Sequence, residues 1–330
     1  MAFSWTTITA ALAVAIGLAQ PADAGRLQKL SNVSSFDDIQ LVDPTFPCSH
    51  RFTGNFEAGD ARKITSARPL LLCLDSPGGS LVEALKVTAF MKQTPIATRL
   101  EANARCESAC ALVFMGGVFW AHESEGPAPW RVMHPTARLG FHAPSLSIPS
   151  GRYDEANVKQ AYGVALQSVA KIVFDLIHRN PTAGSAIPFS LLGEMLTTPP
   201  DQMLYVETVD QAGRWGIDVG PVAQPRGPLV ESHYSGVCAN AFSWIDDESA
   251  KPLYGRRDQL TVASATGTVD DFTVKLLVNE MAETGCEMRV IQDRGEALIG
   301  ITINYRGPVG FDNIMLYDPS TLLSRLPVKR

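Results

Sequence analysis

Three short segments of the chain carry residue types that could together perform nucleophilic catalysis. Gly78 and Gly79 follow an apolar run, Ser108 precedes another, and His142 ends a third. Attack by a serine hydroxyl requires a base that removes its proton and N–H groups that stabilise the developing oxyanion. The sequence therefore predicts a serine hydrolase site, with Ser108 as the nucleophile and His142 as the general base.

The expected surroundings of Ser108 suggest how an oxyanion could be stabilised. Residues 109–115 are apolar and predict a buried helix, so Ser108 would lie at a helix N-terminus. Unpaired N–H groups and the helix dipole favour negative charge there, and the N–H of Ala109 would be one donor. Gly78 and Gly79 lack side chains and could bring a second N–H to the same point. The alternatives are an ordinary N-cap serine and a tight Gly-Gly turn.

These segments resemble the Clp protease proteolytic subunits, and most of all an exported bacterial branch described as periplasmic proteins. The shared motifs are Ser-Pro-Gly-Gly at 76–79, Ser-Ala at 108–109 and the histidine-to-proline segment at 142–144. The resemblance covers about residues 46–220. It implies an α/β, ClpP/crotonase-like parallel sheet with flanking helices, an oxyanion hole formed by Gly78, Gly79 and Ala109, and a Ser-His-Asp triad.

The acid of the implied triad is the weakest part of the match. In the family an aspartate precedes a phrase that ends in a small helix and Gly-Leu-Ile-Asp, and this phrase resembles residues 207–218 here. An ungapped alignment places Leu204 at the aspartate position, and the nearest upstream acid is Asp201. Three alternatives stay open: Asp201 orients His142, another acid does so, or the site is a Ser-His dyad.

The N-terminal residues predict export from the cytoplasm. The apolar core at 8–19 has the length of a signal peptide and is too short to span a bilayer. Pro21 and the small-x-small triplet at 22–24 follow it, so cleavage after Ala24 is expected, with a periplasmic or secreted product. An uncleaved anchor is the alternative. No later segment has the length of a membrane span, so no stable span is expected after cleavage.

The cysteines fit this compartment, because disulfides persist in exported proteins. They are Cys48, Cys73, Cys106, Cys110, Cys238 and Cys286. Cys238 and Cys286 are the only two beyond residue 229 and are expected to pair, and Cys48 and Cys73 lie on expected neighbouring strands. A bridge from Cys106 to Cys110 requires that Cys106 precede the helix. No paired Cys/His set predicts a metal site, and no cofactor is expected.

Composition and compartment narrow the range of partners. The net charge is −6 and no dense Lys/Arg run is present, so a nucleic-acid partner is not expected. The resemblance implies a homo-oligomer and a peptide or unfolded-protein substrate. ATP is not available to an exported protein, so no ATPase partner is expected.

The elements that must position these residues alternate between strands and helices, which predicts α/β architecture. Strands are expected at 48–56, 69–74, 96–100 and 139–142. Helices are expected at 81–93, 108–115, 154–179, 189–196 and 208–215. An irregular lead-in is expected at 25–45, before the main domain at 46–220, and a surface insertion is expected within that domain at 119–136.

A Pro/Gly-rich segment at 219–228 predicts a domain boundary. Beyond it, residues 229–330 predict a small α+β unit with strands at 288–291 and 298–303 and a helix at 270–283.

Three other functions compete with a serine peptidase. The fold could serve as a catalytically inactive scaffold or binding protein, in which the altered aspartate motif reflects lost catalysis. Crotonase-type acyl-CoA chemistry uses a related fold, but export separates the protein from cytosolic CoA thioesters. A membrane serine–lysine peptidase would need a lysine base and a spanning helix, and the sequence suggests neither.

Overall fold

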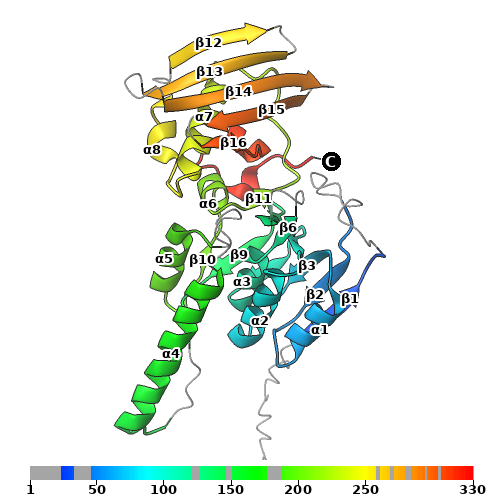
Figure 1. Cartoon of the computed structure of the whole chain (residues 1–330), viewed down its shortest axis with the longest axis vertical. Helices are drawn as coiled ribbons and strands as arrows, with labels where there is room; N and C mark the ends of the chain where they lie inside the picture. Colours follow the sequence, from blue (N-terminus) through cyan, green and yellow to red (C-terminus); the bar gives the residue numbers. More distant parts are fainter. Residues whose placement is uncertain are drawn as a thin grey trace, which may run out of the picture.

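A six-stranded, mostly parallel sheet forms the centre of the first lobe of the computed structural model (Figure 1). Its strands, in spatial order, are β1 (Arg26–Lys29), β2 (His50–Thr53), β3 (Leu71–Asp75), β4 (Ala97–Leu100), β8 (Arg131–Met133) and β11 (Asp218–Val219). Only β1 runs antiparallel to its neighbour. The structure describes residues 24–32, 46–120, 127–145, 151–176, 187–257, 261–267, 271–279, 284–293, 296–303 and 306–329.

The central strand β3 explains why this sheet forms. Its first four residues, Leu-Leu-Cys-Leu, are all buried, as expected of a parallel strand covered on both faces. Helices α1 (Asp60–Ala67), α2 (Leu81–Met91) and α3 (Ala109–Met115) pack in one large apolar core with Leu72 and Leu74. A separate, smaller cluster contains Leu71, Ala97 and Trp130.

A small second sheet contains the strands that Ser108 and His142 directly follow. Its order is β10 (Leu204–Tyr205), β9 (Arg138–Phe141) and β5 (Arg105–Glu107). Strand β5 runs parallel to β9, whereas β10 is antiparallel to it. The hairpin β6 (Val118–Trp120) and β7 (Pro127–Pro129) lies between α3 and β8 in the chain. Helices α5 (Phe189–Thr197) and α6 (Val209–Arg214) follow later.

The long helix α4 (Glu155–Leu176) projects from the first lobe (Figure 1). Apolar side chains recur along it, but Val158, Tyr162 and Leu166 are 58%, 65% and 51% exposed. Ile172, nearer its C-terminal end, is buried in the core. The C-terminal end of the helix therefore packs into the core, while much of the apolar surface nearer its start stays exposed.

The second lobe is a five-stranded antiparallel sheet with short helices beside it. Its strands are β12 (Thr261–Gly267), β13 (Asp271–Asn279), β14 (Thr284–Asp293), β15 (Glu296–Ile303) and β16 (Gly307–Val309). The helical segments are α7 (Glu231–Trp244), α8 (Lys251–Tyr254), η2 (Asn313–Leu316) and η3 (Leu323–Arg325). Strand β15 alternates exposed and buried residues, as expected when one face packs on a core.

The two lobes share one apolar core and are joined by buried hydrogen bonds. The carboxylate of Asp210, at the start of α6, accepts from Trp244 Nε1, Ser249 Oγ and the Ala250 N–H at 3.1, 2.7 and 2.8 Å. The C-terminal segment then returns to the first lobe, where the Val209 N–H donates to the Thr321 carbonyl. These contacts fix α7 and the C-terminal segment against the first lobe.

The mixed α/β class predicted from the sequence is confirmed, with parallel and antiparallel strands and flanking helices. Expected strands at 69–74, 96–100 and 139–142 correspond to β3, β4 and β9, each within two residues. Expected helices at 81–93, 108–115, 189–196 and 208–215 correspond to α2, α3, α5 and α6. The expected signal peptide lies outside the described residues, apart from Ala24.

Three local predictions were wrong. Residues 271–279 form strand β13 instead of a helix. In the sequence, Phe272, Val274 and Leu276 alternate with polar residues, and the strand pairs with both β12 and β14. Part of the expected surface insertion forms strand β8, whose Arg131 and Met133 are buried within the main sheet. Part of the expected irregular lead-in forms β1, an edge strand paired with β2.

All six cysteines are paired. The bridges join Cys48 to Cys73, Cys106 to Cys110 and Cys238 to Cys286, with Cα–Cα distances of 5.9, 5.2 and 5.9 Å. Three disulfides indicate that the chain folds in an oxidising compartment. Among the described residues, no helix combines the length and the apolar character that crossing a membrane requires.

Candidate functional site

The parallel pairing of β5 with β9 brings Ser108 and His142 together. Glu107, the last residue of β5, is in register with Gly140 of β9, and the N–H of Ser108 donates to the Gly140 carbonyl at 2.9 Å. Ser108 and His142 therefore leave the same end of two adjacent strands. Both are half-buried, and both line one cavity.

The backbone of Ser108 adopts a conformation that residues other than glycine rarely adopt. Its φ is 56° and its ψ is −121°, between strand β5 and helix α3. Ser108 occupies the N-cap position of α3, yet its hydroxyl makes no capping hydrogen bond. Backbone strain of this kind costs about 1–3 kcal/mol and is found preferentially at functional sites. A simple capping role therefore does not account for the serine.

The turn that contains Gly78 and Gly79 is packed directly against this strained junction. Gly78 has φ of 103°, and a Cβ on it would lie 2.6 Å from the Glu107 carbonyl oxygen and 2.8 Å from the Ser108 Cβ. Gly79 has φ of 125°, and a Cβ there would lie 2.5 Å from the Phe56 carbonyl oxygen. Both the backbone angles and the close contacts require glycine at these positions.

The N–H groups around Ser108 differ in their availability. The Gly78 N–H donates to Ser76 Oγ at 3.1 Å, so this donor is already engaged. Within the described parts of the chain, the N–H groups of Gly79 and Ala109 donate no hydrogen bond. Gly79 and Ala109 both line the cavity that contains Ser108. They are thus the two backbone donors available for an oxyanion.

His142 is oriented by the main chain. Its Nδ1 lies 2.7 Å from the carbonyl oxygen of Ala143, and because a carbonyl only accepts, Nδ1 carries the hydrogen. In the neutral imidazole, Nε2 is then the acceptor. The Ala143 N–H in turn donates to the Thr198 carbonyl at 2.9 Å, which ties this loop to the end of α5.

The cavity around Ser108 has a volume of about 90 Å³, and both polar and apolar groups line it. Its apolar wall consists of side chains from distant parts of the chain: Leu81, Leu112, Phe141, Pro144, Ile172 and Met195. The sequence patterns did not identify Ile172 of α4 and Met195 of α5 as site residues. Only the tertiary packing of these two helices brings them beside Ser108.

Asp201 does not share the cavity that contains Ser108 and His142. Asp201 is exposed in the loop after α5 and does not line the cavity. Leu204, the residue at the aligned aspartate position, is in register with Phe141, immediately before His142. Among the described residues, the only hydrogen bond of the His142 ring is the one to the Ala143 carbonyl.

The disulfide between Cys106 and Cys110 encloses Ser108. Cys106 lies on strand β5, and Cys110 lies in the first turn of α3, so the bridge spans the strand-to-helix junction. Both cysteines are fully buried. This arrangement meets the condition that the sequence left open, namely that Cys106 precede the helix.

Polar side chains below the junction also fix β5. The Tyr205 hydroxyl donates to Glu107 Oε1 at 2.9 Å, and Arg138 lies over the Tyr205 ring, with its Cζ 4.5 Å from the ring centroid. Burial, followed by the hydrogen bond to Glu107, raises the pKa of Tyr205. These contacts hold the residue before Ser108 in place, and no local sequence signal reveals them.

A possible metal-ligand cluster in the described residues is accounted for otherwise. Cys48, Cys73 and Glu101 have ligand atoms within 4.8 Å of one another. The two sulfur atoms are joined in a disulfide and have no free thiolate to offer a metal.

Comparison of the chain with models of known protein families finds no match, and neither does comparison with curated protein sequences.

Proposed function

We propose that this protein is an exported serine hydrolase of the peptidase type, with a ClpP/crotonase-like fold in its first lobe. The observation that carries the proposal is the conformation of Ser108. It is held at positive φ between β5 and α3, without a capping bond, in a cavity shared with a histidine and two unpaired N–H groups. A structural serine has no need of this combination.

In the proposed reaction, Ser108 Oγ attacks a carbonyl carbon while His142 Nε2 removes the hydroxyl proton. The hydrogen bond from Nδ1 to the Ala143 carbonyl supports this assignment, because it leaves Nε2 as the acceptor. The oxyanion of the tetrahedral intermediate receives hydrogen bonds from the N–H groups of Gly79 and Ala109. Protonated His142 then donates to the leaving amine or alkoxide, and water releases the acyl group.

The composition of the cavity supports an apolar group next to the reacting carbonyl. Leu112, Phe141 and Met195 surround a space of about 90 Å³, which suits a small aliphatic or methyl-bearing side chain. With the expected export to the periplasm, a peptide or a segment of unfolded protein is the proposed substrate class. Extended chains can reach a half-buried serine more readily than folded surfaces can.

A catalytically inactive scaffold is the second candidate, and one observation favours it. No carboxylate in the described residues orients His142, and a main-chain carbonyl stabilises an imidazolium less than an acid does. On this view the strained serine is a remnant of an ancestral site. The two candidates make opposite predictions about the reactivity of Ser108.

The test is labelling of the purified, oxidised protein with a fluorophosphonate probe that reacts with activated serines. We expect labelling of the unmodified protein, none of Ser108→Ala, and a decrease of about 10²–10⁴-fold in rate for His142→Ala. Ser168→Ala removes a serine on α4 and should label at the unmodified rate. Absence of labelling in a correctly folded, oxidised protein would favour the scaffold.

Asp201→Asn in the same assay distinguishes a triad from a dyad. If Asp201 orients His142 in the reacting protein, the labelling rate should fall by orders of magnitude, because the acid fixes the tautomer and stabilises the imidazolium. With the Ala143 carbonyl in that role, the rate should stay within about twofold. The geometry supports the second outcome, since Asp201 is exposed outside the cavity.

A further inference from the structure

A second cavity, of about 990 Å³, lies between the two lobes and shares no lining residue with the cavity of Ser108. One wall comes from β8 and β11 of the six-stranded sheet, and the opposite wall comes from β14, β15 and β16 of the C-terminal sheet. Segment η2 and the end of α7 complete it. The volume is at the upper end of the range of small-molecule sites, about 300–1,000 Å³.

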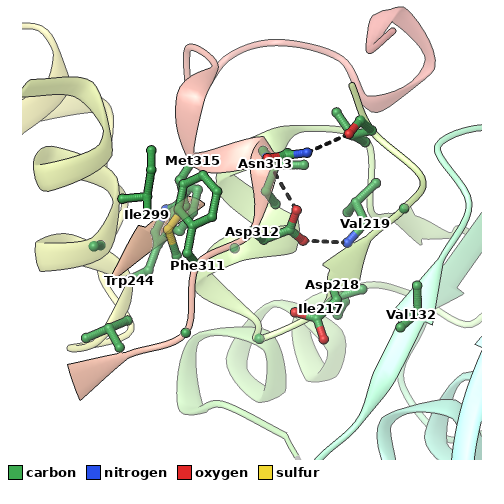
Figure 2. Close-up of a pocket in the computed structure, with 18 of the residues that line it drawn as sticks. Val132, Ile217, Asp218, Val219, Trp244, Ile299, Phe311, Asp312, Asn313 and Met315 are labelled. Atoms are coloured by element: carbon green, nitrogen blue, oxygen red, sulfur yellow. Dashed lines mark hydrogen bonds between the residues drawn. The ribbon is translucent and has the colours of Figure 1, made fainter. Parts of the chain in front are cut away.

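The lining of this inter-lobe cavity is divided into an apolar and an acidic part (Figure 2). Trp244, Ile299, Phe311 and Met315 lie together on the side of the C-terminal lobe. Asp218 and Asp312 lie on the side of the edge strand β11. A ligand that fills both parts must therefore be amphipathic.

The two aspartates have different roles. Asp312 accepts hydrogen bonds from the Val219 N–H at 2.9 Å and from the Ile314 N–H at 3.2 Å, so it joins β11 to η2. Asp218 accepts no hydrogen bond and forms no ion pair among the described residues. Asp218 is exposed, and it lines the cavity. Asp218 is therefore the acid that remains available to a ligand.

The charges around Asp218 leave one negative charge uncompensated. Arg131 is buried and acts on Asp218 electrostatically, but its guanidinium donates to the carbonyls of Gly216, Met115 and Trp215. One arginine beside two carboxylates gives a local charge of −1 when both are ionised.

The other charged residues of the cavity are engaged elsewhere or do not act on Asp218. Lys329 pairs with Glu296 at 2.7 Å, and Arg99 donates to the Phe46 carbonyl and lies over Trp130. Arg289 lies on β14, and neither it nor Arg99 or Lys329 contributes to the pKa of Asp218. Among these cations and Arg131, Arg131 is the one that acts on the pKa of Asp218.

We propose that the inter-lobe cavity binds a small organic cation with an apolar body, its ammonium or guanidinium group beside Asp218 and its body against Phe311 and Met315. This site is independent of the chemistry at Ser108. Neighbouring carboxylates of like charge repel each other, and a bound cation relieves that repulsion. The apolar body adds the free energy of its removal from water.

Protons compete with such a cation for the acid pair. Burial, followed by the charge of Asp312, raises the pKa of Asp218, while Arg131 opposes this shift. Burial also raises the pKa of Asp312, against its backbone hydrogen bonds. A cation should therefore bind more tightly at pH 8, where both carboxyls are ionised, than at pH 5.

The test uses three probes that differ only in their head group: 4-phenylbutylammonium, 4-phenylbutanol and 4-phenylbutanoate. Binding to the purified, oxidised protein is measured by titration calorimetry at pH 8. We expect the ammonium to bind at least about tenfold more tightly than the alcohol, because it gains a charge-assisted interaction with Asp218. Equal binding of the three, or preference for the carboxylate, would overturn the proposal.

A matched pair of variants locates the interaction. Asp218→Asn should lower the affinity for 4-phenylbutylammonium by about tenfold and leave that for 4-phenylbutanol unchanged. Glu155→Gln removes one exposed carboxylate on α4, far from the cavity lining, and should change neither affinity. Unchanged ammonium binding in a folded Asp218→Asn variant contradicts the proposal.

The unmodified protein provides a second measurement in case Asp218→Asn does not fold. Affinity for 4-phenylbutylammonium should fall between pH 8 and pH 5, while affinity for 4-phenylbutanol stays constant. If the two probes respond to pH alike, the acid pair does not bind the cation and the proposal is wrong.

Discussion

The turn at Gly78 and Gly79 packs tightly against the backbone of Ser108. The serine occupies a strained backbone conformation, and the Gly78 backbone approaches so closely that a methyl group would overlap both Glu107 and Ser108. Strain of this kind persists only where the surroundings fix it. The packing of the glycine turn against the junction is therefore part of the site, as much as the hydroxyl itself.

Gly78→Ala should destabilise the protein and suppress the reactivity of Ser108. A Cβ at this position meets backbone atoms that have no free side-chain torsion with which to move away, and φ is 103°. We expect a loss of about 2–4 kcal/mol in the free energy of unfolding, measured by denaturant titration.

Gly163→Ala is the matched control for this substitution. Gly163 lies within α4, and a Cβ there meets nothing within 4 Å. It should raise the stability by about 0.5–1 kcal/mol, as expected for glycine in a helix interior. If Gly78→Ala behaved like this control, the close approach of the turn to Ser108 would not be a constraint.

At the scale of elements, the site depends on two parallel strands and the disulfide that joins one of them to a helix. The register of β5 and β9 sets the separation of Ser108 and His142. The Cys106–Cys110 bridge fixes the turn between β5 and α3. The Cys238–Cys286 bridge instead joins α7 to β14 in the second lobe.

Removal of the Cys238–Cys286 bridge should cost more stability, whereas removal of the Cys106–Cys110 bridge should cost more reactivity at Ser108. The Cys106–Cys110 loop spans a separation of 4 residues, against 48 for Cys238–Cys286. Loop entropy predicts losses of about 2 kcal/mol for Cys106→Ala/Cys110→Ala and about 4 kcal/mol for Cys238→Ala/Cys286→Ala. Fluorophosphonate labelling should nevertheless fall more in the first variant, because only that bridge constrains Ser108.

The comparison requires both double variants to be folded at the assay temperature, which circular dichroism establishes. Equal labelling of the two variants would mean that the strand-to-helix turn keeps its conformation without the bridge. The glycine turn and the β5–β9 pairing would then suffice to position the serine.

At the scale of the molecule, the two lobes are joined by polar groups that lie in or near the shared core. Asp210 binds three donors from the α7–α8 region, and Asp312 links η2 to β11. Asp218 lies beside Asp312 on the β11 side of the inter-lobe cavity and has no hydrogen bond of its own among the described residues. The junction between the lobes is therefore sensitive to the ionisation of the Asp218–Asp312 pair.

The stability contributed by this pair should decrease as the pH rises. The pKa of Asp218 is raised to about 7, from an ordinary value near 4, by burial and by Asp312. The folded state therefore binds more protons than the unfolded state in this interval, so unfolding free energy falls as pH rises through it. Asp218→Asn removes one titrating group and should flatten the dependence of Tm on pH between about 4 and 8.

The histidines change stability with pH in the opposite direction, and they are present both in the unmodified protein and in Asp218→Asn. Burial lowers the pKa of His50 and His134, so their contribution to stability increases as pH rises toward the ordinary histidine pKa. The difference between the unmodified protein and Asp218→Asn isolates the acid pair. Parallel Tm profiles for the two proteins would contradict a raised pKa at Asp218.

The sequence alone determined those features that depend on short-range pattern. Apolar runs bounded by turn residues predict β3, α2, β4, α3 and β9, because the length and periodicity of such a run indicate a buried strand or helix. The order of the glycine pair, Ser108 and His142 predicted that they lie together, and in the structure these residues line or adjoin one cavity. The α/β class follows from the same alternation.

Only the tertiary structure decided the rest, because long-range pairing overrides local preference. Residues 271–279 have a helix-compatible composition but become a strand between two neighbours, and β8 enters the main sheet despite flanking prolines. The Ala143 carbonyl at His142, the strained φ of Ser108 and the cavity wall from Ile172 and Met195 have no sequence signal. The acid pair of the inter-lobe cavity forms only when the C-terminal tail returns to β11, across most of the second lobe.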